Sequence, residues 1–155
     1  MQPGEIIYPQ GFFTQLKYLA GQNLSEIELR LGFRSGRLAN GAYVVQAEEL
    51  PKIDQFNLTG YSQVSGDRFK TNGLYDATKL NRMSGNADVE ILKAMVLSKW
   101  QTSGPDSLVK VIPVIRHSDF ETYPPGSGVP QWEVTVALRC HVATFIEPNC
   151  RFALH

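Results

Sequence analysis

The sequence predicts an α+β domain in which N-terminal helices precede a mainly antiparallel, twisted sheet with one central helix. Three observations lead to this prediction. Helical spacing of apolar residues dominates the start of the chain, β-type segments dominate its later part, and one late segment alternates strictly between polar and apolar residues. The chain has 155 residues, 43% hydrophobic and 19% charged, which suits a single domain over residues 1–155 with a sizeable core.

The N-terminal part is expected to be helical. Residues 11–20 place apolar side chains at helical spacing, so they predict a first helix that ends at Gly21. Asn23 or Ser25 can then cap a second helix, which Gly32 stops early.

The middle of the chain mixes strand signals with a long irregular stretch. Residues 42–46 and 56–63 have the composition of strands. Residues 64–86 are rich in Gly, Ser, Asn and Asp, which predicts a loop with at most a short helix near residues 75–82. A long loop in a compact domain is often functional.

A clearer helix and another strand follow this loop. Residues 87–101 predict the central helix, with Asp88 and Glu90 in its first turn, where they complement the helix dipole. Residues 108–115 predict a strand in which Pro113 indicates an edge or a bulge. The stripe that we expect the helix to bury consists of Ile91, Leu92, Met95, Val96 and either Lys99 or Trp100.

The most informative segment is a Pro/Gly loop, residues 123–130, that runs into one long strand pattern over residues 131–142. Its polar face holds Gln131, Glu133, Thr135, Ala137, Arg139 and His141, and its apolar face holds Trp132, Val134, Val136, Leu138, Cys140 and Val142. This polar row can form the floor of a polar pocket. The alternative is an antiparallel strand with one solvated face.

Composition excludes some function classes. The 15 basic and 15 acidic residues balance, so no general attraction to nucleic acid or membranes is expected. No apolar run approaches the roughly 20 residues of a membrane span, and the first residues lack a signal pattern. We therefore expect a soluble protein that, if secreted, leaves without a cleaved signal peptide. Cys140 and Cys150 are expected to be free thiols rather than a zinc site.

A second segment, residues 30–38, combines arginines with glycines. Guanidinium groups bind phosphate oxygens in pairs, and a glycine bend can direct backbone N–H groups at the same anion. A dinucleotide pyrophosphate fits this chemistry. A helix C-terminus with a glycine cap and basic residues near the dipole explains the same pattern equally well. The residues concerned are Arg30, Arg34, Arg37, Gly32 and Gly36.

Together the two segments resemble a known family. An Arg-x-Gly-x-x-x-Gly motif after an N-terminal helix, followed by a late Pro-Gly-x-Gly and a Gln-aromatic pair, resembles the NAD glycohydrolase domain of the tuberculosis necrotizing toxin family. The same domain occurs in bacterial contact-dependent and type VI secreted toxins. Arg30 matches the arginine of the motif, and Gln131 before Trp132 matches the glutamine. Leu50 and Pro51 are similar to the Leu-Pro step in the family's middle region.

The chain also departs from the family pattern. Leu38 stands where the family usually has an aromatic residue, so stacking on the substrate would fall to Phe33, Tyr43 or Tyr61. Pro130 is one extra residue before the glutamine. The chain also continues past the motif, where the family tends to stop.

The resemblance implies an NAD(P)+ glycohydrolase toxin that acts in interbacterial competition and needs neither a metal nor another cofactor. It implies a secretion-system carrier, action in the cytoplasm of the target cell, and a tight-binding immunity protein that plugs the cleft. The chemistry agrees, because nicotinamide leaves as a neutral molecule and needs no strong general acid. The enzyme has to hold the pyrophosphate, distort the ribose, stabilise positive charge and admit one water.

The resemblance and this chemistry together assign roles to residues. Arg30, aided by Arg34 or Arg37, would hold the phosphates. Gln131 would bind the ribose hydroxyls or orient the water, and Glu133 could stabilise the developing cation. The remaining substrate-binding candidates are Gly32, Gly36, Phe33 and Trp132.

Two other functions stay open at this stage. A ribonuclease could use Glu133 as base, His141 as acid and Arg139 as phosphate clamp. Residues 133 and 141 are roughly 26 Å apart along a straight strand, so this needs a sharp bend or His117 in place of His141. A non-enzymatic binding or immunity module could use the exposed Gly/Pro loops. Convergence of Arg30 and Gln131 on one ligand-sized cleft would favour the enzyme.

Overall fold

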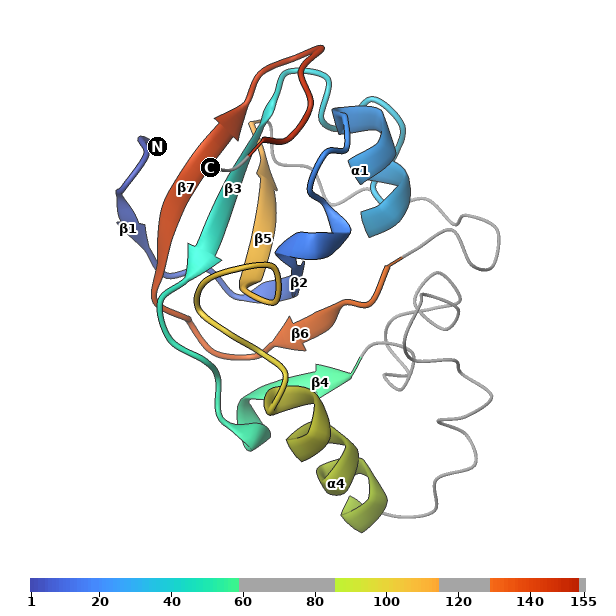
Figure 1. The fold of residues 1–155 in the computed structure, drawn as a ribbon, viewed down its shortest axis with the longest axis vertical. Coiled ribbons are helices and arrows are strands. Elements are labelled where there is room, and N and C mark those ends of the chain that lie inside the picture. Colours follow the sequence, from blue (N-terminus) through green and yellow to red (C-terminus); the bar gives the residue numbers. More distant parts are fainter. Residues whose placement is uncertain (59–85, 115–128, 154–155) are drawn as a thin grey trace.

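A computed structural model describes residues 1–58, 86–114 and 129–153 (Figure 1). The described residues form a curled, seven-stranded antiparallel sheet with the order β1-β7-β3-β5-β2-β6-β4, so the predicted α+β class is confirmed. The strands are β1 (Ile6–Ile7), β2 (Gly11–Gln15), β3 (Ala42–Ala47), β4 (Phe56–Leu58), β5 (Leu108–Pro113), β6 (Trp132–Val134) and β7 (Cys140–Ile146). The helices are α1 (Leu24–Leu31) and α4 (Asn86–Leu97), with short 3-10 turns η1 (Leu16–Tyr18) and η2 (Ile53–Gln55).

Within the described residues, no strand pairs with the strand that precedes or follows it in sequence. The central strand β3 lies between β5 and β7, and the short β1 pairs with β7 at the far end of the chain. Strand β2 pairs with β5 only through Thr14 and Gln15, and its earlier residues pair with β6 instead. Beyond Val109, one side of β5 therefore has no pairing partner among the described strands.

The first predicted helix is wrong. Residues 11–15 form β2, and η1 supplies a single tight turn after it. Phe13 lies opposite Trp132 and Thr14 opposite Val109. Five residues are too few to distinguish a period of 2 from one of 3.6, and pairing on both sides of β2 outweighs the local helical spacing.

Helix α1 begins and ends where the sequence predicts. Asn23 Oδ1 accepts the Glu26 N–H at 2.8 Å, and Glu26 Oε1 accepts the Asn23 N–H at 3.2 Å, which makes a capping box. Gly32 ends the helix in the left-handed region, at φ +78°. The predicted strand over residues 42–46 is confirmed as β3. The one over residues 108–115 is confirmed as β5 as far as Pro113, and residue 115 lies outside the described residues.

The central helix exists, but its buried face differs from the prediction. Ile91 and Met95 were expected to face inward, yet they are 61% and 56% exposed. The helix buries Lys93, Val96 and, just past its end, Trp100. Contact with η2 sets this rotation, because α4 has to present Val96 and Trp100 to the core below β4.

The predicted strand over residues 131–142 is two strands. The break at residues 135–139 carries the chain from β6 to β7, which the sheet separates by three other strands. Thr135 donates its N–H and its hydroxyl to the Gln55 carbonyl, and the Leu138 N–H donates to the Pro9 carbonyl. Val136 and Leu138 still face the core, so the alternation continues across a corner.

The sheet has an apolar core on each face. Along β5, Leu108 and Ile112 belong to one cluster, and Val109 and Val111 belong to the other. Helix α1 covers the second cluster, whereas Trp100 packs edge-on against Trp132 in the first, with ring centroids 5.2 Å apart.

Some predictions fall outside the described residues. These are the end of the strand over residues 56–63, the predicted loop at 64–86 except its last residue, with the short helix expected near 75–82, and residues 123–128 of the Pro/Gly loop. No helix in the part of the chain that the structure describes is long and apolar enough to cross a bilayer.

Candidate functional site

The two segments that the sequence places in one site meet in space. Three hydrogen bonds fix residues 129–131 against α1 and β2. The Val129 N–H donates to the Arg30 carbonyl at 3.0 Å, and Gln131 Nε2 donates to the Leu31 carbonyl at 3.1 Å. Thr14 Oγ1 donates to the Pro130 carbonyl at 2.7 Å. The last carbonyls of α1, which have no partner within the helix, are thus satisfied by the segment that precedes β6.

The arginine-rich turn binds a carboxylate of the chain itself. Glu28 is 5% exposed and accepts the Gly36 N–H at 3.1 Å and the Leu38 N–H at 2.6 Å. The expectation that these backbone amides cradle an external anion is therefore wrong. Gly32 caps α1, and Leu38 is buried in the core instead of facing a substrate. The Glu28 carboxylate thus holds the backbone on both sides of Arg37.

The three arginines have different environments. Arg30 Nη1 donates to the Tyr18 carbonyl at 2.6 Å, which ties the end of α1 to η1. Arg34 is exposed. Arg37 is half-buried and, with Phe33, lines a large cleft, whereas Arg30 is not among the residues that line it. Of the three, Arg37 is therefore the one that faces ligand-sized space.

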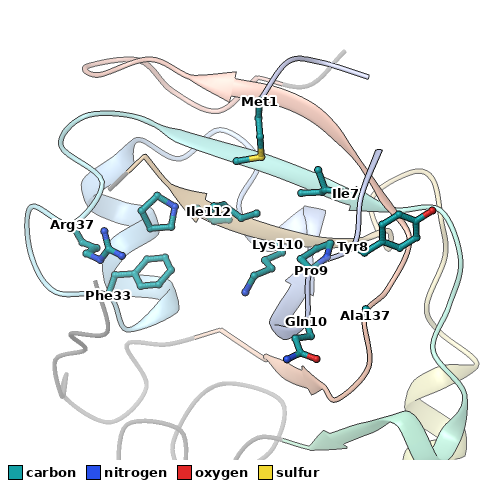
Figure 2. A pocket seen from close by; sticks show the side chains of 12 residues that line it. Met1, Ile7, Tyr8, Pro9, Gln10, Phe33, Arg37, Lys110, Ile112 and Ala137 are labelled. Atoms are coloured by element: carbon teal, nitrogen blue, oxygen red, sulfur yellow. The ribbon is translucent and has the colours of Figure 1, made fainter. Parts of the chain in front are cut away.

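This cleft has a volume of about 820 Å³, within the usual range of ligand sites. It opens beside residues 110–113 of β5, where β2 has turned away to pair with β6. Phe33 and Arg37 lie at one end, Tyr8 lies at the other, and Lys110 lies between them (Figure 2). The described lining residues include two cations and no acidic side chain, although the chain as a whole is neutral.

Sequence reasoning missed Lys110. Its amino group lies 3.4 Å from the Phe12 carbonyl and 5.8 Å from the centre of the Phe13 ring. A Cβ on Gly11 would stand 3.3 Å from that amino group, so glycine leaves room for it. The available signal was a lysine inside an otherwise apolar β run, between the buried Val109 and Val111. Such a lysine needs a polar space, which here is the cleft.

A hollow of about 60 Å³ adjoins the cleft. Gln131, Phe12 and Leu31 line it, and it shares Phe33 and Lys110 with the cleft. A volume of this size holds one or two waters at roughly 30 Å³ each. The hollow therefore places the buried Gln131 amide beside water-sized space that Lys110 also lines.

Trp132 and Glu133 do not join this site. Trp132 is 1% exposed and packs in the core, so it offers no face to a ligand. Glu133 is half-buried on β6 and accepts a 3.4 Å hydrogen bond from Asn57 Nδ2. Neither is among the described residues that line the cleft or the hollow.

The ribonuclease residues are separated as well. Strands β2, β5 and β3 stand between Glu133 on β6 and His141 on β7. His141 Nδ1 instead lies 3.3 Å from Glu48 Oε1, which forms an ion pair when the imidazole is protonated. Arg139 Nη1 donates to the Tyr8 hydroxyl at 2.9 Å. His117 lies outside the described residues.

The described residues contain no cluster of side chains that could hold a metal ion, and their two cysteines are free. No three His, Cys, Asp or Glu side chains gather there in a group that could hold a metal ion. Cys140 and Cys150 are both free, as predicted, the first buried and the second exposed. Burial, aided by the nearby Glu49 carboxylate, raises the pKa of Cys140 from 9.0 to about 12, so its thiol is a poor nucleophile.

Comparison with protein-family models, with curated proteins and with solved structures finds no match to this chain.

Proposed function

We propose that this protein is an NAD(P)+ glycohydrolase that releases nicotinamide from the dinucleotide. The observation that carries the proposal is the contact between the predicted catalytic segment and the end of α1. Gln131 reaches the Leu31 carbonyl, and a hollow and a cationic cleft lie beside it. The resemblance requires these two segments to meet. The expected convergence of Arg30 and Gln131 on one ligand-sized cleft is not found, because Gln131 lines only the small hollow and Arg30 lines neither space.

The cleft supports a revised set of roles. Arg37 and Lys110 would hold the two phosphates, because a guanidinium and an ammonium together match a diphosphate in charge. Phe33 would pack against the nicotinamide or its ribose. Arg30 would act indirectly, by fixing the end of α1 on which Arg37 and Phe33 depend.

Gln131 would act next to the small hollow. A water held there would attack the ribose carbon as the bond to nicotinamide breaks and its electron pair leaves with the neutral base. The water's proton then passes to solvent. The positive charge of the ribose would be stabilised by the bound phosphates and by the Gln131 amide. Glu133, which was expected to stabilise the cation, lines neither the cleft nor the hollow and has no role in this proposal.

The biological setting is part of the same proposal. An enzyme that depletes NAD(P) is toxic to the cell that makes it. We therefore expect delivery by a secretion-system carrier, action in the target-cell cytoplasm and a protective immunity protein. A cleft of this size gives that immunity protein a concave surface to plug.

The test follows nicotinamide release from NAD and from NADP by the purified protein. Lys110→Met, Arg37→Met and Gln131→Ala should each lower kcat/KM by about 10-fold to 1000-fold, because each removes a group that binds developing or fixed charge. Lys52→Met, at an exposed position away from the cleft, is the matched control and should keep full activity.

Three outcomes would contradict parts of the proposal. Intact NAD and NADP after hours with folded wild-type protein would refute the activity. Full activity in all three cleft variants would spare the activity and refute the site. Tight binding of the dinucleotide without turnover would favour the binding module instead.

A further inference from the structure

The N-terminal arm, residues 1–10, forms one wall of the cleft. Tyr8, Pro9 and Gln10 belong to this arm and line the cleft at the end away from Arg37 (Figure 2). Backbone hydrogen bonds hold the arm in place. The Val142 N–H donates to the Glu5 carbonyl and the Leu138 N–H donates to the Pro9 carbonyl, each at 2.9 Å. Tyr8 therefore lies on a wall with a fixed position.

Tyr8 is 57% exposed, and yet one charged side chain holds its hydroxyl, while a second charged residue fixes the backbone of the first. Arg139 Nη1 donates to the Tyr8 hydroxyl at 2.9 Å. The backbone N–H of Arg139 in turn donates to Glu49 Oε1 at 3.1 Å. An exposed tyrosine that serves only solubility needs no such anchor. A large ring that is exposed and held at one edge is typical of a binding surface.

The order of groups along the cleft points to a ligand. Tyr8 supplies an aromatic ring at one end, Lys110 supplies an ammonium group in the middle, and Arg37 supplies a guanidinium further on (Figure 2). A nucleoside diphosphate presents a planar base, a ribose and then two phosphates in that order. Its base can stack on an aromatic face, and its phosphates need cations that are not next to that face.

We propose that Tyr8 is the platform on which the cleft stacks a nucleotide base, with the diphosphate on Lys110 and Arg139 as the residue that positions Tyr8. For NAD(P) this orientation puts the adenine on Tyr8 and directs the nicotinamide towards Phe33 and Gln131. That last step rests on the proposed function. Binding of a nucleoside diphosphate to Tyr8 and Lys110 does not.

The test measures equilibrium binding of two probes, ADP and inorganic pyrophosphate, by titration calorimetry. Tyr8→Leu should weaken ADP binding by about 10-fold and leave pyrophosphate unchanged, because stacking on the base is lost. Lys110→Met should weaken both probes. Tyr8→Phe keeps the ring and should retain most of the ADP affinity. Tyr8 is largely exposed, so these substitutions remove no core packing.

Arg139 needs a readout of its own, because it acts through Tyr8. Arg139→Met should weaken ADP but not pyrophosphate, and it should cost nothing further when combined with Tyr8→Leu. That loss of additivity separates positioning from a general electrostatic effect, which would weaken pyrophosphate too.

The outcomes are distinct from those of the activity test. ADP binding that is unchanged in Tyr8→Leu, or a folded wild type that binds neither probe, would overturn this proposal. If ADP binds as described while NAD and NADP stay intact, the base platform stands and the glycohydrolase fails. If NAD is hydrolysed with the same KM in Tyr8→Leu, the activity stands and the platform fails.

Discussion

The side-chain amide of Gln131 donates to the main-chain carbonyl of Leu31 at 3.1 Å and so joins two positions 100 residues apart. The amide is buried, and the carbonyl belongs to the last residue of α1. A residue singled out for catalysis thus also completes the hydrogen bonding of a helix end. Loss of activity in a Gln131 variant is interpretable only when its stability is measured as well.

Gln131→Ala should lower the free energy of unfolding by about 1–3 kcal/mol, because the Leu31 carbonyl is left buried without this donor. Urea unfolding followed by circular dichroism measures the change. Gln46→Ala is the matched control. Its amide donates to the Thr102 carbonyl at 3.4 Å on the surface, so we expect a change within about 0.5 kcal/mol. Equal losses in the two variants would contradict the capping role.

Glu28→Ala should destabilise the fold by about 2–4 kcal/mol, because two backbone N–H groups of the arginine-rich turn lose a buried acceptor. We also expect lower activity, since Arg37 lies between the two residues whose amides Glu28 holds. Urea unfolding and nicotinamide release would be measured on the same preparation. Glu5→Ala, at an exposed carboxylate, should change neither. Unchanged stability in Glu28→Ala would show that the turn holds its shape without the carboxylate.

Gly41→Ala should be more destabilising than Gly21→Ala. Both glycines have positive φ, +98° and +78°, so each substitution carries a backbone penalty of about 1–2 kcal/mol. A Cβ at Gly41 would in addition clash with the Phe145 ring and stand 2.9 Å from the Ile146 carbonyl oxygen, whereas at Gly21 it meets nothing. Thermal unfolding of the two variants measures the effect of the clash at Gly41, because the backbone penalty is similar in both. Equal melting temperatures would show that the clash costs no stability.

Stability should fall at alkaline pH through Cys140. The folded thiol keeps its proton up to a pKa of about 12, while the unfolded thiol loses it near 9.0, so rising pH favours the unfolded chain. The stability that the protonated Cys140 thiol contributes is complete below pH 9 and is lost as the pH rises towards 12. Cys140→Ala should lack this part of the pH dependence, and Cys150→Ala should retain it.

The pH experiment needs a correction for other groups. A hydrogen bond from Lys17 to Asp106 raises the pKa of Lys17, and this lysine is the same in every variant. Its effect therefore cancels when the urea midpoints of the variants are compared with wild type. Identical profiles for Cys140→Ala and wild type above pH 9 would contradict the prediction.

Local signals in the sequence predicted much of the fold but not its connections. Asn23 and Gly32 mark the two ends of α1 by local chemistry, which any context preserves. The strand at residues 11–15 was missed because its conformation depends on β5 and β6, which lie far away in sequence. The corner at residues 135–139 was missed because Val136 and Leu138 remain apolar and inward-facing on both sides of the turn.

The candidate site was predicted in part for the same reason. The Gly/Arg turn and the glutamine segment carry recognisable local patterns, so Phe33, Arg37 and Gln131 could be named from the sequence. Lys110 and Tyr8 join the cleft only through the sheet order and the path of the N-terminal arm, which no local pattern encodes. Arg30 matched its motif, but a single nearby carbonyl, that of Tyr18, directs its side chain elsewhere.

The order of the strands also determines when this sheet can assemble. Because every partner of a described strand is distant in the chain, the seven described strands offer no hairpin that could form early and guide the rest. The last strand, β7, has to insert between β1 and β3 near the beginning of the sequence. Assembly of the described sheet therefore waits until nearly the whole chain is present, and a chain still emerging from a ribosome would lack its central pairing until then.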